Sequence, residues 1–120
     1  MDYSKLSDKE INKKVAFALG CKEVVPDIFM DDNRRYEFDK PKNKSGNKFY
    51  FDPCNNITDA WPIILRSRIS MVWDCAEYAS AEWWNAFDPF DDCRIEYQSN
   101  PLRAAMTVFL MMHEGRQPPS

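Results

Sequence analysis

The sequence is poor in the residues that mark common catalytic and metal sites. Its 120 residues include one histidine, His113, and three isolated glycines, Gly20, Gly46 and Gly115. A phosphate-binding loop needs several glycines close together, because its backbone must approach the phosphate closely. The four cysteines lie 33, 21 and 18 residues apart, whereas a zinc knuckle places two ligands about two to four residues apart. The sequence therefore predicts no metal site and no cofactor.

The chain also lacks a long apolar run, a secretion signal and an excess of positive charge. No segment approaches the roughly 18 apolar residues that a membrane-spanning helix needs, and residues 1–5 contain no apolar signal core. The net charge is −3, while a general nucleic-acid binder carries a basic surface that neutralises phosphates. We therefore expect neither a membrane nor a nucleic acid as partner. The cytosol is the expected compartment, where the four cysteines are most simply buried thiols.

Charge is distributed unevenly along the chain. Residues 1–60 hold eleven basic and eleven acidic side chains, and every lysine lies at or before Lys48. Residues 61–120 hold five arginines against eight acids, so the whole net charge belongs to the second half. An acidic surface can bind a basic protein, although it more often serves solubility. The four lysines between residues 40 and 48 have no aromatic residue among them, which predicts a solvated loop.

Two segments carry clear helix signatures. Ser7 and Glu10 form a capping box, which predicts a helix over residues 8–19. Gly20 is the expected C-terminal stop of this helix. Near the end of the chain, Asn100 and Pro101 supply the N-cap and the first residue of a second main helix. One face of that helix should form a wall of the core, because its apolar residues follow a single helical stripe. They are Leu102, Ala105, Met106, Phe109, Leu110 and His113.

Short strands are predicted between these helices. Residues 24–30 contain Pro26 and form either a short strand or a turn, while residues 49–51 and 69–73 read as strands. Residues 75–87 are ambiguous, because their alanine-rich start favours a helix and their tryptophans favour a strand. Residues 94–97 alternate and could pair with the tryptophan segment. We expect one α+β domain over residues 1–120, with two main helices on an antiparallel sheet of about four strands. Residues 115–120 should form a disordered tail.

The densest group of functional side chains lies between residues 51 and 62. This segment contains two prolines, two carboxylates, two amides, a thiol and an indole, more than a connector requires, and a regular helix should begin at Pro62. Asp52 and Asp59 could form a catalytic pair and Cys54 could be a nucleophile. The only histidine, His113, is distant in the sequence, so a Cys54–His113 dyad requires the two residues to meet in the fold. Turn or capping roles suit the acids better. We therefore expect a binding site and no enzyme.

Ligand pockets combine a few fixed hydrogen-bonding groups with an aromatic wall. The candidate ligand-binding residues are Asp52, Cys54, Asn55, Asn56, Asp59, Trp61, Trp84 and Arg103. Arg103 lies in the first turn of the last helix, where the helix N-terminus can receive an anion. The alternative is that Trp61 and Trp84 belong to the core and that the polar groups only satisfy the loop backbone.

Three motifs resemble the phage NinX-like family, which consists of small accessory proteins of tailed phages and prophages of enterobacteria. The motifs are Pro53-Cys54-Asn55-Asn56, Pro62-Ile63-Ile64 and Asn100-Pro101-Leu102-Arg103-Ala104-Ala105-Met106. One common branch of the family has a glycine pair where this chain has Ala60-Trp61, which favours an aromatic wall over close backbone contact with a ligand. The resemblance implies a protein made in the cytoplasm of the infected host. Phage accessory proteins often counter host defence, and this family has no settled activity.

Two main functions are compatible with these features, and the family context leaves open a third, structural or DNA-metabolism role that the negative charge disfavours. The first is non-enzymatic sequestration of a small nucleotide-like ligand, such as a host immune signal. The second is inhibition of a host defence or metabolic complex by protein–protein contact through the acidic, aromatic-rich second half. Either function is compatible with a homo-oligomer.

Overall fold

The computed structural model describes residues 2–31 and 48–115. Within these residues the fold is α+β, as predicted, but it has three α-helices and two three-stranded antiparallel sheets. The predicted arrangement, two main helices on one antiparallel sheet of about four strands, therefore matches the structure only roughly. In chain order the elements are η1 (Tyr3–Lys5), α1 (Asp8–Ala18), β1 (Cys21–Val25), β2 (Ile28–Asp31), β3 (Lys48–Tyr50), α2 (Ile57–Ser67), β4 (Ser70–Cys75), η2 (Glu77–Ala79), β5 (Glu82–Phe87), β6 (Arg94–Gln98) and α3 (Pro101–Gly115).

Two predicted segments fall largely outside the described residues. The lysine-rich loop between residues 40 and 48 has only Lys48, the first residue of β3, within them. Of the predicted tail, Gly115 is the last residue of α3, and residues 116–120 lie outside.

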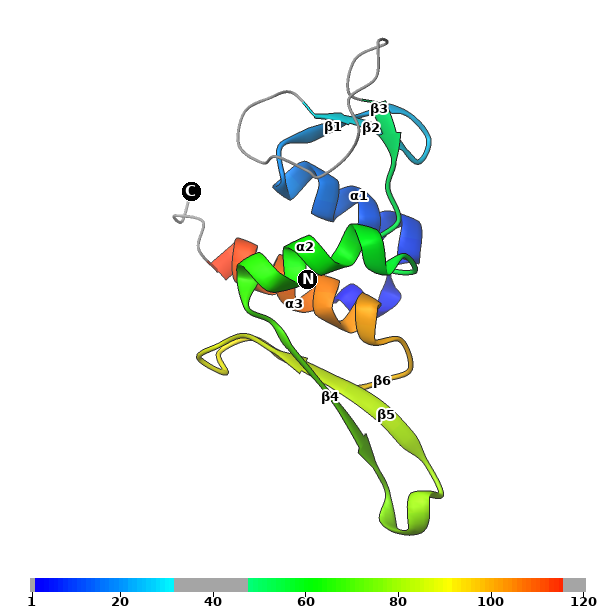
Figure 1. Cartoon of the computed structure of the whole chain (residues 1–120), viewed down its shortest axis with the longest axis vertical. Helices are drawn as coiled ribbons and strands as arrows, with labels where there is room; N and C mark the ends of the chain where they lie inside the picture. Colours follow the sequence, from blue (N-terminus) through cyan, green and yellow to red (C-terminus); the bar gives the residue numbers. More distant parts are fainter. Residues whose placement is uncertain (1, 32–47, 116–120) are drawn as a thin grey trace.

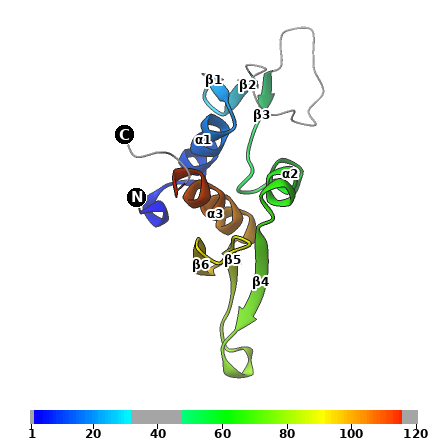
Figure 2. The ribbon, with the colours of Figure 1, turned by 90° about the vertical axis from the view of Figure 1, so that its left-hand side faces the viewer.

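Helix α3 lies at the centre of the molecule. Figures 1 and 2 show α1 and α2 above it and the strands β4, β5 and β6, which we call sheet B, below it. Every residue from Ala104 to Leu110 is buried, because α1, α2 and sheet B contact the helix on different sides. The predicted apolar stripe is thus only part of the buried surface, which also includes Thr107 and Val108. A helix surrounded by other elements is apolar on all sides.

Helix α1 joins α3 to sheet A, which consists of β1, β2 and β3 in that order. The predicted capping box is confirmed, since Ser7 Oγ accepts the Glu10 N–H at 3.1 Å and Glu10 Oε1 accepts the Ser7 N–H at 3.2 Å. Gly20 follows the helix with φ 88°, as expected of a stop. Ile11 and Val15 on α1 are fully buried, and each such side chain contributes about 1.5–3 kcal/mol.

Sheet A settles the prediction for residues 24–30. The segment belongs to two strands, β1 and β2, which turn at Pro26 and Asp27. Residues 49–51 supply β3, and Phe51 follows this strand into the core. Its ring lies 6.1 Å from that of Phe29 in an edge-on contact, which helps to fix sheet A to the helices.

Sheet B resolves the ambiguous segment. Residues 82–87 form the strand β5, while residues 77–79 form a single turn at the tip of the β4–β5 hairpin. The alanine-rich start does not continue as a helix, because Tyr78 has left-handed torsion angles of φ 63° and ψ 20°. The predicted hairpin of β5 with residues 94–97 is confirmed. The register places Met71, Ala86 and Ile95 on one face, which packs against the core beside α3.

Helix α2 begins at Ile57 and not at Pro62, so this prediction was wrong. Asn56 caps it, because Asn56 Oδ1 accepts the Thr58 N–H at 3.0 Å. Pro62 therefore lies in the second turn, where it cannot donate to the carbonyl of Thr58. Thr58 is exposed, so water can bind that carbonyl and the missing bond costs little.

Candidate functional site

The segment from Asp52 to Asn56 forms a tight loop between β3 and α2. The Asp52 carbonyl accepts the N–H groups of Asn55 at 3.1 Å and Asn56 at 2.8 Å. From the first turn of α2, the buried Asp59 accepts the Asp52 N–H at 2.9 Å. These bonds fix the loop against the start of the helix, the role that turn-forming acids and amides commonly have.

Asn12 of α1 holds this loop from the other side. Its side chain is 5% exposed, and its Nδ2 donates to Asp52 Oδ1 at 2.7 Å. Its Oδ1 accepts the Cys54 N–H at 3.0 Å. Sequence reasoning missed this residue. The available signal was an asparagine beside Ile11 on the apolar face of a helix, where asparagine is a poor helix former.

Arg103 is committed to the N-terminal segment of the chain. Its side chain is 17% exposed, and its Nη1 lies 2.7 Å from Asp8 Oδ1. Its Nη2 donates to the carbonyls of Tyr3 at 3.1 Å and Leu6 at 2.6 Å. Asn55 joins this group to the loop, since its Nδ2 lies 3.2 Å from Asp8 Oδ2 and 3.1 Å from an Asp52 oxygen.

The cap of α3 also contacts the loop. Asn100 Oδ1 accepts the N–H groups of Leu102 at 2.9 Å and Arg103 at 3.2 Å, and its Nδ2 donates to the Cys54 carbonyl at 2.7 Å. Two of the sequence motifs, residues 53–56 and residues 100–106, therefore meet in space. We call Asp8, Asn12, Asp52, Asn55, Asn100 and Arg103 the polar cluster. Its hydrogen bonds tie α1, the loop and α3 together.

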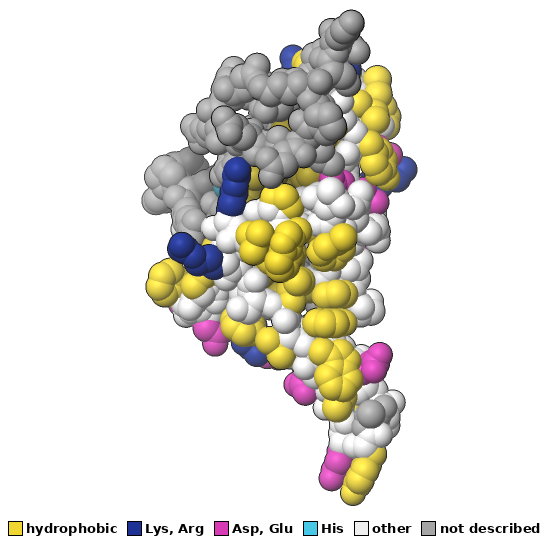
Figure 3. Space-filling view, in the orientation of Figure 1, with side chains coloured by type: hydrophobic (Ala, Val, Ile, Leu, Met, Phe, Trp, Pro, Cys, Tyr) yellow, Lys and Arg dark blue, Asp and Glu magenta, His cyan; other side chains and the backbone are white. Residues whose placement is uncertain are grey.

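The structure brings six of the eight candidate residues to the loop and its surroundings and separates the two tryptophans from them. Asp52, Cys54, Asn55, Asp59 and Arg103 lie in or against the polar cluster, and Asn56 is the exposed cap of α2. The two tryptophans lie away from it. Trp61 is 46% exposed on α2 between Ile57 and Leu65, which are also exposed. Trp84 is half-buried in β5. Figure 3 shows hydrophobic side chains gathered over α2.

Two further observations limit the chemistry of the described residues. A cavity of about 310 Å³ lies between α1 and α3, and it contains none of the candidate residues. Its lining is Lys14, Phe17, Ala18, Leu110, His113 and Glu114. Over residues 2–31 and 48–115 there is no cluster of three or more side chains suited to holding a metal ion. The helices of the same ranges are too short or too polar to cross a membrane.

The Cys54 thiol is poorly suited to act as a nucleophile. Burial, together with the nearby Asp8 carboxylate, raises the pKa of Cys54 to about 12, so the thiol is neutral at physiological pH. Cys21 is also buried, as predicted. Cys75, the last residue of β4, and Cys93, just before β6, are only half-buried, so this prediction was wrong for them.

We expect Cys54 to resist iodoacetamide at pH 8 while Cys75 reacts, with mass spectrometry reading the modified sites. The free energy of unfolding has its full contribution from the neutral Cys54 thiol below the ordinary thiol pKa of about 8.5. This contribution is lost as the pH rises towards 12, because only the unfolded chain ionises readily in that range. Modification of Cys54 at a rate similar to that of Cys75 would contradict this assignment.

A family model described as "Bacteriophage P22, NinX" matches residues 2–113. The chain belongs to this NinX family. The resemblance of the sequence motifs is therefore confirmed, and the protein is a phage accessory protein. Comparison with curated proteins gives no match. The family match covers the polar cluster and sheet B alike, so both are candidates for the functional site of this NinX-family protein.

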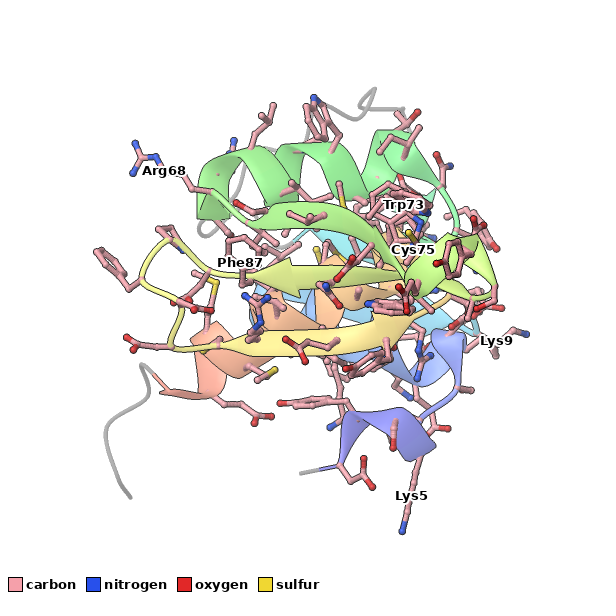
Figure 4. All side chains as sticks on the ribbon, turned by 90° about the horizontal axis from the view of Figure 1, so that it is seen from below. Lys5, Lys9, Arg68, Trp73, Cys75 and Phe87 are labelled. Carbon is pink, nitrogen blue, oxygen red and sulfur yellow. The ribbon has the colours of Figure 1, made fainter. Side chains whose placement is uncertain are left out.

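Sheet B has a face that turns away from α3, and Figure 4 shows this sheet in front of the helix when seen from below. Side chains alternate along a strand, so the residues next in sequence to Met71, Ala86 and Ile95 point to this outer face. Three aromatic residues lie on it. The Trp83 and Tyr97 rings are 5.0 Å apart, and the Arg94 guanidinium lies 4.8 Å from the Phe87 ring.

Acidic residues surround these aromatic side chains. Arg94 contacts Glu96 at 2.8 Å and Asp91 at 3.2 Å, and Asp74 is exposed on β4. Tyr97 is 70% exposed and has φ 60° at an irregularity in β6. We define the outer face of sheet B as Val72, Asp74, Trp83, Phe87, Arg94, Glu96 and Tyr97. This is the acidic, aromatic-rich part of the second half that the sequence indicated.

Proposed function

We propose that this NinX-family protein is a non-enzymatic accessory protein that acts in the host cytoplasm by binding and inhibiting another protein. The outer face of sheet B is the proposed contact surface. The observation that carries this proposal is a sheet face turned away from the core that holds three aromatic residues, of which Tyr97 is exposed and Trp83 and Phe87 are half-buried. The expected target is a component of a host defence or metabolic complex with a basic surface.

The residue types of the outer face support this proposal. An antiparallel sheet packed on one side normally presents polar residues on the other. Here the outward positions hold Trp83, Phe87 and Tyr97, and Arg94 lies among them. Aromatic residues and arginine are enriched in protein interfaces and supply most of their binding energy. The surrounding carboxylates would favour a basic partner and speed its association.

The backbone of Tyr97 adds a second argument. A non-glycine residue in the left-handed region is uncommon and costs roughly 1–2 kcal/mol. Asparagine tolerates this conformation better than tyrosine does. Tyr97 therefore carries a backbone cost at φ 60° that a better-suited residue would avoid. Its ring contacts Trp83 but stays exposed, and contact with a partner is a further use for it.

Sequestration of a nucleotide-like ligand has less support. The donors and acceptors of Asp52, Asn55 and Arg103 already form hydrogen bonds within the chain. A ligand would find Asn56 and Trp61 exposed on α2. Calorimetry with a panel of cyclic and ADP-ribose-type nucleotides tests this alternative. Saturable heat that Trp61→Ala abolishes would favour it over the protein-binding proposal.

Tyr97→Asn should abolish capture of the partner and change the stability little, because relief of the left-handed backbone offsets the lost ring contact with Trp83. Asparagine relieves the left-handed residue but removes the aromatic ring, and loss of an interface aromatic commonly costs about 2 kcal/mol or more, at least about thirtyfold in affinity. The measurement is affinity capture from phage-infected host cells with quantitative mass spectrometry, together with the thermal midpoint of each variant.

Asn55→Ala is the matched control for this experiment, because it removes an exposed polar side chain from the other candidate site. A partner lost with Tyr97→Asn and retained with Asn55→Ala supports the outer face. The reverse pattern would contradict the proposal and return the site to the loop of residues 52–56.

A further inference from the structure

Among the described residues, β4 is an edge strand of sheet B, and the polar backbone groups on its outer side point away from the sheet. The Ala76 N–H donates to the Ala81 carbonyl at 2.8 Å, which identifies these residues as a hydrogen-bonded pair of the β4–β5 ladder. Such pairs alternate along an antiparallel ladder. In the register of β4 and β5, Met71, Trp73 and Cys75 therefore direct their N–H and C=O groups outward. The Cys75 N–H bonds to Asp74 Oδ1 at 2.8 Å, as expected of an outward group.

The β4 edge lacks most of the features by which proteins protect an edge strand. Common protections are lysine, proline and a bulge. Residues 70–75 contain neither lysine nor proline, and their pairing with β5 is continuous. The other edge of the sheet is different, because β6 has an irregular register and the left-handed Tyr97. Within the described chain, no backbone hydrogen bond joins Met71 or Trp73 to another element.

The lower part of this edge is also open. Figures 1 and 2 both show the β4–β5 hairpin extending beyond α3, with no described element beside the outer side of β4 there. Val72 is 45% exposed and Trp73 is 48% exposed. Figure 3 shows hydrophobic side chains continuing from α2 along this part of the molecule. A regular, apolar and open edge strand is a template for another strand.

We propose that two copies of the chain pair through β4 in antiparallel orientation, with the twofold axis at Trp73. Trp73 then lies opposite Trp73 of the second copy, and Met71 lies opposite Cys75, so outward groups meet outward groups. Val72 faces Asp74 across the axis, which keeps the two Asp74 carboxylates apart. The two three-stranded sheets become one sheet of six strands, and their outer faces lie side by side.

The opposite charges at the two ends of β4 favour a second copy of the chain as the partner that pairs with this edge. Residues 70–90 contain acidic residues and no lysine or arginine, so the hairpin tip is negative. Arg68, at the other end of β4, is exposed and points away from the molecule in Figure 4. Antiparallel pairing about Trp73 brings the end of β4 that follows Arg68 towards the hairpin tip of the second copy, which carries Glu77. Each dimer gains two such contacts, an arrangement that a twofold axis requires.

Analytical ultracentrifugation over roughly 1–100 µM tests this proposal, because dimerisation depends on concentration. The wild-type chain should sediment as a dimer of twice 14.1 kDa. Trp73→Pro should be monomeric, because proline removes an outward N–H that β5 does not use. Trp73→Thr is the matched control, since it also removes the indole but keeps the N–H, and it should still dimerise.

A charge exchange provides a second readout that does not depend on proline. Arg68→Glu and Glu77→Arg should each weaken dimerisation about tenfold, and their combination should restore it to within about threefold of the wild type. If circular dichroism shows that Trp73→Pro is unfolded, this exchange decides the question. A wild-type chain that stays monomeric, a dimer that tolerates Trp73→Pro, or a combination that fails to recover would overturn the proposal. None of these outcomes depends on the Tyr97→Asn experiment.

Discussion

Arg103→Met is expected to lower the free energy of unfolding by about 3 kcal/mol. Methionine keeps the apolar stem of the side chain but leaves Asp8 and the carbonyls of Tyr3 and Leu6 without their donor. Hydrogen bonds to a charged group contribute about 1.5–3 kcal/mol. The Asp8 side chain is 41% exposed, so solvent screens the ion pair and most of the loss comes from the two carbonyls. Urea denaturation followed by tryptophan fluorescence measures the change.

Arg94→Met is the matched control for this experiment. Arg94 also contacts two carboxylates, Asp91 and Glu96, but it lies on the surface. Solvent screens exposed ion pairs, so this substitution should leave the denaturation midpoint nearly unchanged. If Arg103→Met and Arg94→Met had equal effects, Arg103 would not hold the N-terminal segment, and its guanidinium would again be available for a ligand.

Asn12→Leu is expected to cost about 2–3 kcal/mol of stability. Leucine has the same number and branching of side-chain non-hydrogen atoms and suits a helix better, although its methyl groups are bulkier. Most of the loss therefore reflects the missing amide group. The Cys54 N–H loses its buried acceptor and Asp52 Oδ1 loses a donor. A buried backbone N–H without a partner costs about 1–3 kcal/mol. The same urea denaturation provides the measurement.

Asn55→Ala separates this effect from the general loss of an amide in the polar cluster. Asn55 also contacts Asp52, but it is exposed, so water can replace its hydrogen bonds. Its substitution should cost less than 1 kcal/mol. An Asn12→Leu variant as stable as the wild type would show that the loop does not depend on its buried contact with α1. An Asn55→Ala variant that loses as much stability as Asn12→Leu would show the same.

The local parts of this fold could be predicted from the sequence. The Ser7–Glu10 capping box and the Asn100–Pro101 start are decided by residues three or fewer positions apart, and both helices form where these signals place them. The start of α2 could not be placed in the same way. The Asn56 cap competes there with the rule that proline stays in the first turn. The cap prevails because Thr58, whose carbonyl loses its partner, is an exposed residue that water can reach.

Contacts between distant residues explain what the sequence did not indicate. It identified the polar segment of residues 51–62 but not its partner Asn12, which lies 40 residues from Asp52 in the chain. Arg103 lies 95 residues from Asp8, so the helix start suggested an anion site where the structure has an internal clamp. The ambiguity of residues 75–87 depended on one backbone conformation, that of Tyr78, which composition does not reveal.

Recognition through the outer face of sheet B, with the polar cluster serving the fold, is tested most directly by photo-crosslinking in infected cells. A benzoyl-phenylalanine residue is introduced at position 97 in one variant and at position 55 in another, and each is irradiated during infection. The outer-face assignment predicts a discrete crosslinked partner from position 97 and none from position 55. A partner crosslinked from position 55 alone would contradict it.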